Sequence, residues 1–212
     1  MNIAKTIKFC NLSVAAFLSC ISLATNAVTL DFESLSAPGH PLFPTGIAQP
    51  YEEDGFKITT GGGQSLSFYG TSNSAYLGSI MLFNNTLNPA SSPAETKIET
   101  VSGNLFSISE ITLAKVVVTA AVSETFVGTK ADDSTVQVTF NIPSGTIAST
   151  ITSFFFPNTF VDLKSVSWFQ SQASPDNRVV QIDNVVVSAV PLPPALLLFT
   201  GGALWLVRRR RG

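Results

Sequence analysis

Residues 125–140 read TFVGTKADDSTVQVTF, and this stretch decides the fold class. Two runs rich in β-branched and aromatic residues flank Ala131-Asp132-Asp133-Ser134, a polar tetrapeptide typical of a tight turn. Val136, Val138 and Phe140 recur at every second position, so they share one face of an extended strand. The stretch therefore predicts a β-hairpin with one buried face.

Short runs of this kind recur throughout residues 28–189, and no long apolar repeat with helical spacing interrupts them. The run Ile111–Ala120 is nearly continuous in apolar character with Lys115 as its single charge, which is typical of a central strand. The number of runs predicts an all-β body of two packed sheets. The predicted strands are Val28–Glu33, Gly55–Thr60, Ser65–Tyr69, Ala75–Phe83, Thr96–Val101, Ile111–Ala120, Glu124–Lys130, Thr135–Phe140, Thr146–Phe155, Ser165–Gln170 and Val179–Ser188.

The N-terminal segment has the pattern of a signal peptide. Lys5 and Lys8 precede an apolar run from Phe9 to Ala24, and Thr25-Asn26-Ala27 ends in the small residue that signal peptidase requires. We expect cleavage after Ala27, so residues 1–27 are removed. A lipoprotein signal with Cys20 as its first mature residue is the alternative, but Phe17 and Leu18 are bulky for such a box.

The C-terminal segment, residues 190–212, has three consecutive parts. Val190-Pro191-Leu192-Pro193-Pro194 breaks regular structure, Ala195–Val207 is apolar, and the basic residues Arg208, Arg209, Arg210 and Arg211 follow. The apolar part is short for an independent membrane anchor, and arginines favour the cytoplasmic side. This order predicts transient insertion into the inner membrane, and a permanent single-pass anchor is the alternative.

This tail resembles the PEP-CTERM sorting signal of Gram-negative bacteria, in which a Pro-Glu-Pro motif precedes a transmembrane helix and a basic cluster. Leu192 stands where the motif has Glu, as in a Val-Pro-Leu-Pro variant of the signal. The resemblance implies signal peptidase and exosortase as processing partners. It also implies an exported protein of the cell surface, extracellular matrix or biofilm of a polysaccharide-producing host.

The body is similar to exported domains that precede such tails. The resemblance rests on Leu30-Asp31-Phe32-Glu33, on Tyr51–Ile58, on Phe106–Leu113 and on Ile182-Asp183-Asn184-Val185. It implies a single jelly-roll-like β-sandwich over residues 28–189, similar in outline to galactose-binding modules. A body of roughly 160 residues is large enough for one hydrophobic core.

Composition limits the partners of this body. All fourteen Asp and Glu lie within residues 28–189, together with six of the twelve Lys and Arg, so the body carries a formal charge of about -8. Such a charge repels phosphate, and we expect no nucleic-acid partner. Cys10 and Cys20 both lie in the predicted signal peptide, so the mature protein contains no thiol.

Candidate catalytic groups are few. The single histidine, His40, lies between Gly39 and Pro41 in a predicted loop, and the chain has no Gly-x-Ser-x-Gly turn. The acidic run Glu52-Glu53-Asp54 is the candidate for a carboxylate-based glycosidase, the alternative function. Because neighbouring residues of a strand point in opposite directions, we predict a non-catalytic protein.

Calcium is the cofactor that the acidic groups suit best, because hard divalent ions bind carboxylate and carbonyl oxygens. First and last strands are neighbours in a jelly roll, which brings Asp31 and Glu33 close to Asp183. Asp31 and Glu33 are two residues apart and share a face if both lie on one strand. The sequence predicts a calcium site here, with hydrogen bonding of the chain ends as the alternative.

Aromatic residues suggest weak binding of extracellular polysaccharide. Tyr51, Tyr69 and Tyr76 combine an apolar ring with a polar group, as a sugar-stacking platform requires. Sixteen Phe against three Tyr indicate that most aromatic surface is core, and Trp168 is predicted to be buried.

Overall fold

The computed structural model describes residues 26–35, 44–61, 65–73, 75–85, 95–115, 120–145, 151–169 and 180–190. These residues form an all-β structure with one short 3-10 turn. The elements are β1 (Ala27–Leu30), η1 (Glu33–Leu35), β2 (Thr45–Gly46), β3 (Tyr51–Glu53), β4 (Phe56–Thr60), β5 (Ser65–Phe68), β6 (Leu82–Asn85), β7 (Glu95–Thr100), β8 (Phe106–Lys115), β9 (Val122–Lys130), β10 (Thr135–Ile142), β11 (Thr152–Phe155), β12 (Leu163–Phe169) and β13 (Val180–Ala189).

The predicted hairpin is confirmed. β9 and β10 pair antiparallel from Thr129 opposite Thr135 to Val122 opposite Ile142. Its turn closes with a hydrogen bond from the Lys130 amide to the Ser134 carbonyl, and Asp133 takes a left-handed conformation at φ 65°. Phe140 is buried, and Val136 and Val138 are partly buried against the core on the same face, as the alternation indicated.

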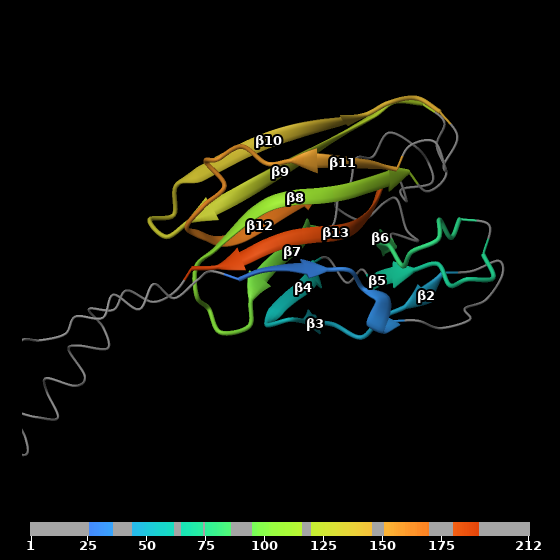
Figure 1. Ribbon diagram of the computed structural model, residues 1–212, viewed down its shortest axis with the longest axis horizontal. Coiled ribbons are helices and arrows are strands. Elements are labelled where there is room, and N and C mark those ends of the chain that lie inside the picture. The colour runs from blue at the N-terminus through green and yellow to red at the C-terminus, as the bar shows by residue number, and fades with distance from the viewer. Residues whose placement is uncertain are drawn as a thin grey trace, which may run out of the picture.

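The strands form two antiparallel sheets. The first sheet has the order β2-β5-β6-β13-β8-β11, with β1 beside β13, and the second has the order β3-β4-β7-β12-β9-β10. A single pair, Leu163 of β12 opposite Phe106 of β8, connects them. Figure 1 shows β13 and β8 in front of β12 and β7, so the two sheets form the layers of a sandwich.

The core lies between these layers. Each sheet turns alternate apolar residues inward, and they form one cluster that includes Leu30, Ile111 and Val185 from the first sheet and Ile98 and Val166 from the second. Edge-on contacts between aromatic rings connect the layers, for example Phe56 with Phe106 at 5.4 Å. The Trp168 side chain is buried within this cluster, as predicted.

Two strand predictions were displaced along the chain. The segment predicted as a strand over Ala75–Phe83 is irregular up to Met81, because Gly78 has φ 96° and Tyr76 closes a turn onto Asn73. The central strand is Phe106–Lys115 where Ile111–Ala120 was predicted. The first half of this strand was not predicted because it contains polar residues at 107, 109 and 110. These residues face outward, and a bulge places two of them in succession, which interrupts the alternation.

The first strand also ends earlier than predicted. β1 stops at Leu30, Phe32 takes a left-handed conformation at φ 59°, and Glu33 begins the 3-10 turn. Asp31 and Glu33 therefore do not share a strand face, because the backbone turns between them. The Glu33 amide donates to Asp31 Oδ1 at 3.1 Å instead, as in an Asx turn.

The ends of the body are adjacent. β1 pairs antiparallel with β13, and Ala27, the first residue of β1, lies opposite Ser188. The neighbouring first and last strands that the sequence predicted are therefore observed. Residues 1–25 of the predicted signal peptide, which spans residues 1–27, and the predicted membrane segment lie outside the described residues. In the described part of the chain, no helix combines the length and the apolar character needed to cross a membrane.

Candidate functional site

Two of the predicted calcium ligands, Glu33 and Asp183, lie together at the outer surface of the first sheet. Ser79 Oγ lies 2.8 Å from Glu33 Oε1 and 2.7 Å from Asp183 Oδ2, so one hydroxyl contacts both carboxyl groups. Glu33 Oε1 also accepts the Ile80 amide at 2.9 Å. The segment before β6 thus connects the 3-10 turn after β1 to strand β13. We call Glu33, Ser79 and Asp183 the carboxylate bridge.

Asp183 is the buried member of this bridge. Its side chain is 2% exposed although it lies on the outer face of the sheet, paired with Thr112 of β8. Asp183 Oδ1 accepts the Asn184 amide at 2.7 Å, and Oδ2 accepts Asn184 Nδ2 at 3.0 Å. Burial raises the pKa of Asp183 to about 6, and the negative charges of Glu33 and Asp31 act in the same direction.

A second carboxyl group continues the network through β3. Glu53 Oε2 accepts the Phe32 amide at 3.3 Å and the Tyr51 hydroxyl at 3.2 Å, and that hydroxyl also contacts Ser34 Oγ at 3.0 Å. Burial raises the pKa of Glu53, and the nearby Asp31 carboxylate adds to the shift. The arrangement fastens the chain that follows β1 to the edge of the second sheet.

Closeness of the three predicted calcium ligands does not by itself make a metal centre. The structure brings Asp31, Glu33 and Asp183 close enough for their charges to interact, as the sequence predicted. Within the described residues, however, no group of three or more His, Cys, Asp or Glu is arranged to hold a metal ion. The oxygens that face one another are occupied by hydrogen bonds from Ser79, Ile80 and Asn184.

The predicted aromatic platform needs correction. Tyr51 and Tyr69 are only 7% and 6% exposed, so their ring faces are not available to a sugar. Tyr51 packs edge-on against Phe32, and Tyr69 stacks on Phe83 at 4.9 Å between ring centres. Tyr76 is partly buried against the core. The polar hydroxyl groups predicted a surface position for these residues, but the Tyr51 hydroxyl contacts Glu53 and Ser34 in a partly buried network.

Two phenylalanines are exposed, although the excess of Phe over Tyr indicated that most aromatic residues belong to the core. Phe155 of β11 is 72% exposed on the outer face of the first sheet, opposite Glu110 of β8. Phe169 of β12 is 51% exposed on the outer face of the second sheet, opposite Glu95 of β7. Phe155 follows Phe154 and precedes Phe156, and the two-residue period of a strand was the signal that one member of this run points outward.

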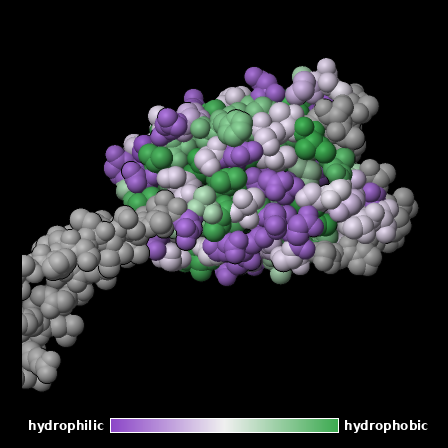
Figure 2. Space-filling model, viewed as in Figure 1, coloured by the Kyte–Doolittle hydropathy of each residue, from purple (hydrophilic) through white to green (hydrophobic). Residues whose placement is uncertain are grey.

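The surroundings of Phe155 are polar. Ser153, two residues earlier on the same face, contacts Thr112 through their hydroxyl groups at 3.1 Å, and exposed Ser109 lies beside Glu110. Figure 2 shows this face as a mosaic of hydrophobic and hydrophilic residues without one continuous hydrophobic surface. An aromatic ring surrounded by hydroxyl and carboxylate groups can stack on a sugar while its neighbours bond the hydroxyls.

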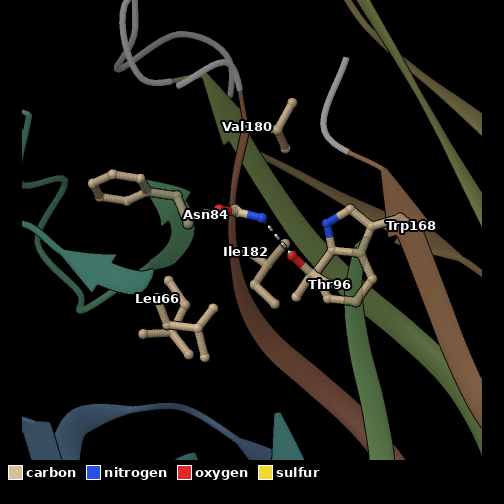
Figure 3. Close-up of a pocket in the computed structure, with 8 residues that line it drawn as sticks. Leu66, Asn84, Thr96, Trp168, Val180 and Ile182 are labelled. Atoms are coloured by element: carbon tan, nitrogen blue, oxygen red, sulfur yellow. Dashed lines mark hydrogen bonds between the residues drawn. The ribbon is translucent and has the colours of Figure 1, made fainter. Parts of the chain in front are cut away.

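One small cavity lies inside the sandwich. Leu66, Asn84, Thr96, Trp168 and Ile182 contribute to its lining, and its free volume of about 10 Å³ is close to the space of one water molecule. Figure 3 shows the Asn84 amide directed at the Thr96 hydroxyl across the cavity, and these atoms are 3.4 Å apart. The cavity is too small for a sugar or a cofactor.

The remaining sequence candidates fall on or beside undescribed residues. Val190 is the first residue of the predicted tail and the last described residue of the chain, and its amide donates to the Leu105 carbonyl at 2.8 Å. His40 and Cys20 lie outside the described residues, as do the other members of the predicted sorting motif, Pro191, Leu192, Pro193, Arg208, Arg209, Arg210 and Arg211.

Comparison with known proteins gives little beyond this geometry. No protein-family model matches the chain, and no curated protein matches it. Among solved structures, it is similar to a mutant of a family 29 carbohydrate-binding module, at 12% identity and a TM-score of 0.40, covering 69% of this chain and 90% of that chain. A likeness this distant assigns neither a family nor a ligand.

Proposed function

We propose that this protein is an exported, non-catalytic β-sandwich protein, sorted by exosortase to the cell surface or extracellular matrix, where it binds glycan weakly. The observation that carries the proposal is the match between the folded body and the predicted processing boundaries. β1 begins at Ala27 and β13 ends at Ala189, directly before the motif that starts at Val190. Export signals on both flanks are consistent with a body that folds between them.

The pairing of Ala27 with Ser188 supports a model in which both flanking segments occupy the membrane during export. Because the two residues are cross-strand neighbours, both flanking segments leave the body at the same end. Two hydrophobic segments that leave together can occupy one membrane during export, with the rest of the sandwich directed away from it. Transient inner-membrane insertion followed by release therefore requires no rearrangement of the core.

The carboxylates favour a binding protein over the alternative, a secreted glycosidase. Glycosidases need two carboxyl groups that face one cleft about 5 to 9.5 Å apart. Glu52 is exposed and Glu53 is partly buried in hydrogen bonds on the other side of β3. Glu33 and Asp183 are close together, but Asp183 is covered and its oxygens are bonded to Asn184 and Ser79.

The glycan-binding part of the proposal rests on Phe155. The Phe155 ring is mostly exposed, and a ligand that covers it gains about 25 cal/mol for each Å² of apolar surface removed from water. One ring among polar groups is too small an apolar area for a stable protein interface, which buries at least about 1,200 Å². A sugar has both the apolar face for the ring and the hydroxyls for Glu110 and Ser153.

Intact mass spectrometry of cell-associated and released protein tests the sorting proposal. We expect the released form to begin at Val28 and to lack the four terminal arginines, whereas the precursor retains them. Replacing Pro191 and Pro193 by alanine should leave the protein cell-associated, while Thr29→Ala, which is exposed on β1, should be processed normally. A released form with an intact tail, or no released form in a host that has exosortase, contradicts the proposal.

A further inference from the structure

β10 is the longest of the strands that have a single partner strand. It contains eight residues, whereas β1, β2, β3 and β11 contain two to four. β10 pairs with β9, and no described residue forms a backbone hydrogen bond with its other side. Figure 1 shows β10 along the outer margin of the molecule. The second sheet therefore ends in a long open edge.

The register of the hairpin shows which backbone groups face this open edge. The Lys130 amide donates to the Ser134 carbonyl, and hydrogen-bonded pairs alternate along an antiparallel ladder. Val136 and Val138 therefore direct their amide and carbonyl groups to β9. The residues that direct these groups to the open edge are Thr135, Gln137, Thr139 and Asn141.

β10 lacks the features that protect open edges in other proteins, which are charged side chains, proline and bulges. Its sequence, TVQVTFNI, contains no charged residue and no proline, and its pairing with β9 has no register shift. Two of its polar side chains bond to β9 and not to the edge. Thr139 Oγ1 lies 2.8 Å from Thr125 Oγ1, and Asn141 Oδ1 accepts the Ser123 hydroxyl at 2.7 Å. Another strand can therefore pair with β10 unhindered.

The sequence of β10 is complementary to itself in an antiparallel arrangement centred on Val138. In this register Gln137 of one copy lies opposite Thr139 of the other, and Thr135 lies opposite Asn141. All four residues that face the open edge then form hydrogen-bonded pairs. A shift to either neighbouring register that keeps these pairs leaves one of the four without a partner on β10.

The same arrangement suits the charge and the apolar residues of the strand. A body with a formal charge of about -8 repels its own copies, but β10 is uncharged, and the acidic turn Asp132-Asp133 of one copy lies beyond Ile142 of the other. Parallel pairing would instead bring the two acidic turns together. On the inner face, the partly buried Val136 and Val138 lie opposite Phe140 and Val138 of the second copy.

We propose that β10 is an association edge that binds a second copy of this protein. The two copies pair antiparallel around Val138 and join their second sheets into one continuous sheet, a form of strand addition. This association is separate from the proposed glycan site, because the Phe155 ring lies on the outer face of β11 in the first sheet.

Disulfide trapping in the full chain tests the pairing. Cys10→Ser and Cys20→Ser remove the native thiols, so Val138→Cys introduces the only one. Its two copies face each other at about 4.5 to 5.5 Å between Cβ atoms, and oxidation should give a covalent dimer on a non-reducing gel. Val136→Cys is the matched control on the same face. Its two copies lie about 14 Å apart along the strands, beyond the reach of a disulfide, so this variant should stay monomeric. Equal cross-linking of the two variants, or none with Val138→Cys, overturns the proposal.

Changes at Gln137 give a second readout in the Val138→Cys chain. Gln137→Pro removes an amide that faces the open edge and no hydrogen bond to β9, so the covalent dimer should be lost. Gln137→Lys keeps the backbone groups but adds a charge to the exposed edge, and it should also reduce cross-linking. Thr29→Lys, exposed on β1, is the charge-matched control and should cross-link like the parent. An unchanged melting temperature shows that a variant is folded. Undiminished cross-linking in a folded Gln137 variant, or equal loss in Thr29→Lys, contradicts the association edge.

Discussion

Ala27 and Ser188 lie opposite one another at the end of the β1–β13 ladder, although 160 residues separate them in sequence. The ladder continues inward through Val28 with Val187 to Leu30 with Val185, so the first residues after the predicted cleavage site are part of the sheet. Both flanks of the body therefore leave from one point, and the body itself is closed by pairing its own two ends.

A protein limited to residues 28–189 should fold without either flank. The core cluster is built from residues within this range, and deletion of Ala27 removes only one exposed position of the β1–β13 pairing. We expect a soluble, β-rich protein with a cooperative melting transition by circular dichroism. An insoluble or unfolded product would mean that the tail belongs to the fold, and the sorting proposal would lose its basis.

The first strand should contribute substantially to stability. Leu30 is fully buried against the core, and Leu→Ala changes at such sites cost about 2 to 5 kcal/mol. Leu30→Ala should lower the free energy of unfolding in urea by that amount. Thr29→Ala, one residue earlier and exposed, is the matched control and should stay within about 0.5 kcal/mol. Equal effects of the two changes would mean that β1 is not packed as described.

The fold class and most strands were predictable because their signal is local. Alternation at Val136, Val138 and Phe140 located a half-buried strand, since every second residue faces the core. Features that depend on tertiary contacts could not be predicted from the local sequence. Lys115 marked the central strand as its single charge, but the sequence did not show that its side chain is fully buried and donates to the carbonyls of Ala120, Pro143 and Gly145.

The candidate site was predictable only in part, for a related reason. The topology placed Asp31, Glu33 and Asp183 near one another, because neighbouring first and last strands follow from the fold. Ser79 carried no signal of its own, since an irregular segment after Gly78 brings it to the bridge. Tyr51 was assigned to the wrong environment and the exposure of Phe155 was not predicted, because side-chain chemistry alone does not show which face of a strand is covered.

Gly128 should tolerate no larger side chain. It lies on the inward face of β9, and a Cβ there would come within 3.0 Å of Leu163 Cδ2 and Val136 Cγ2. Overpacking of this kind costs about 1 to 3 kcal/mol, so Gly128→Ala should lower the urea midpoint. Gly46→Ala of β2 is the control, because nothing lies within 4 Å of the added carbon. A neutral Gly128→Ala would show that β9 and β12 separate more easily than the packing indicates.

The calcium site stays a prediction with a direct test. An ion that binds only the folded state stabilises it by about 2.7 kcal/mol at a hundredfold excess over its dissociation constant. Calcium should raise the melting temperature, and Asp183→Ala should abolish the response. Because protons compete for Asp183, whose pKa is about 6, the response should be larger at pH 7.5 than at pH 5. A melting curve indifferent to calcium and chelator would leave these carboxylates as hydrogen-bonding groups alone.

Glycan binding should depend on Phe155 and not on Phe169. Both rings are exposed and each lies opposite a glutamate, but Phe155 is more accessible and has Ser153 and Ser109 beside it. Stacking on an aromatic ring contributes on the order of 1 kcal/mol, so Phe155→Ala should weaken retention in affinity electrophoresis through soluble polysaccharide about fivefold. Phe169→Ala is the matched control, and both variants should keep the wild-type melting temperature because neither ring is buried. Equal retention of all three proteins on a panel of neutral and acidic polysaccharides would remove Phe155 as a sugar platform, since no other change to that face accompanies the substitution.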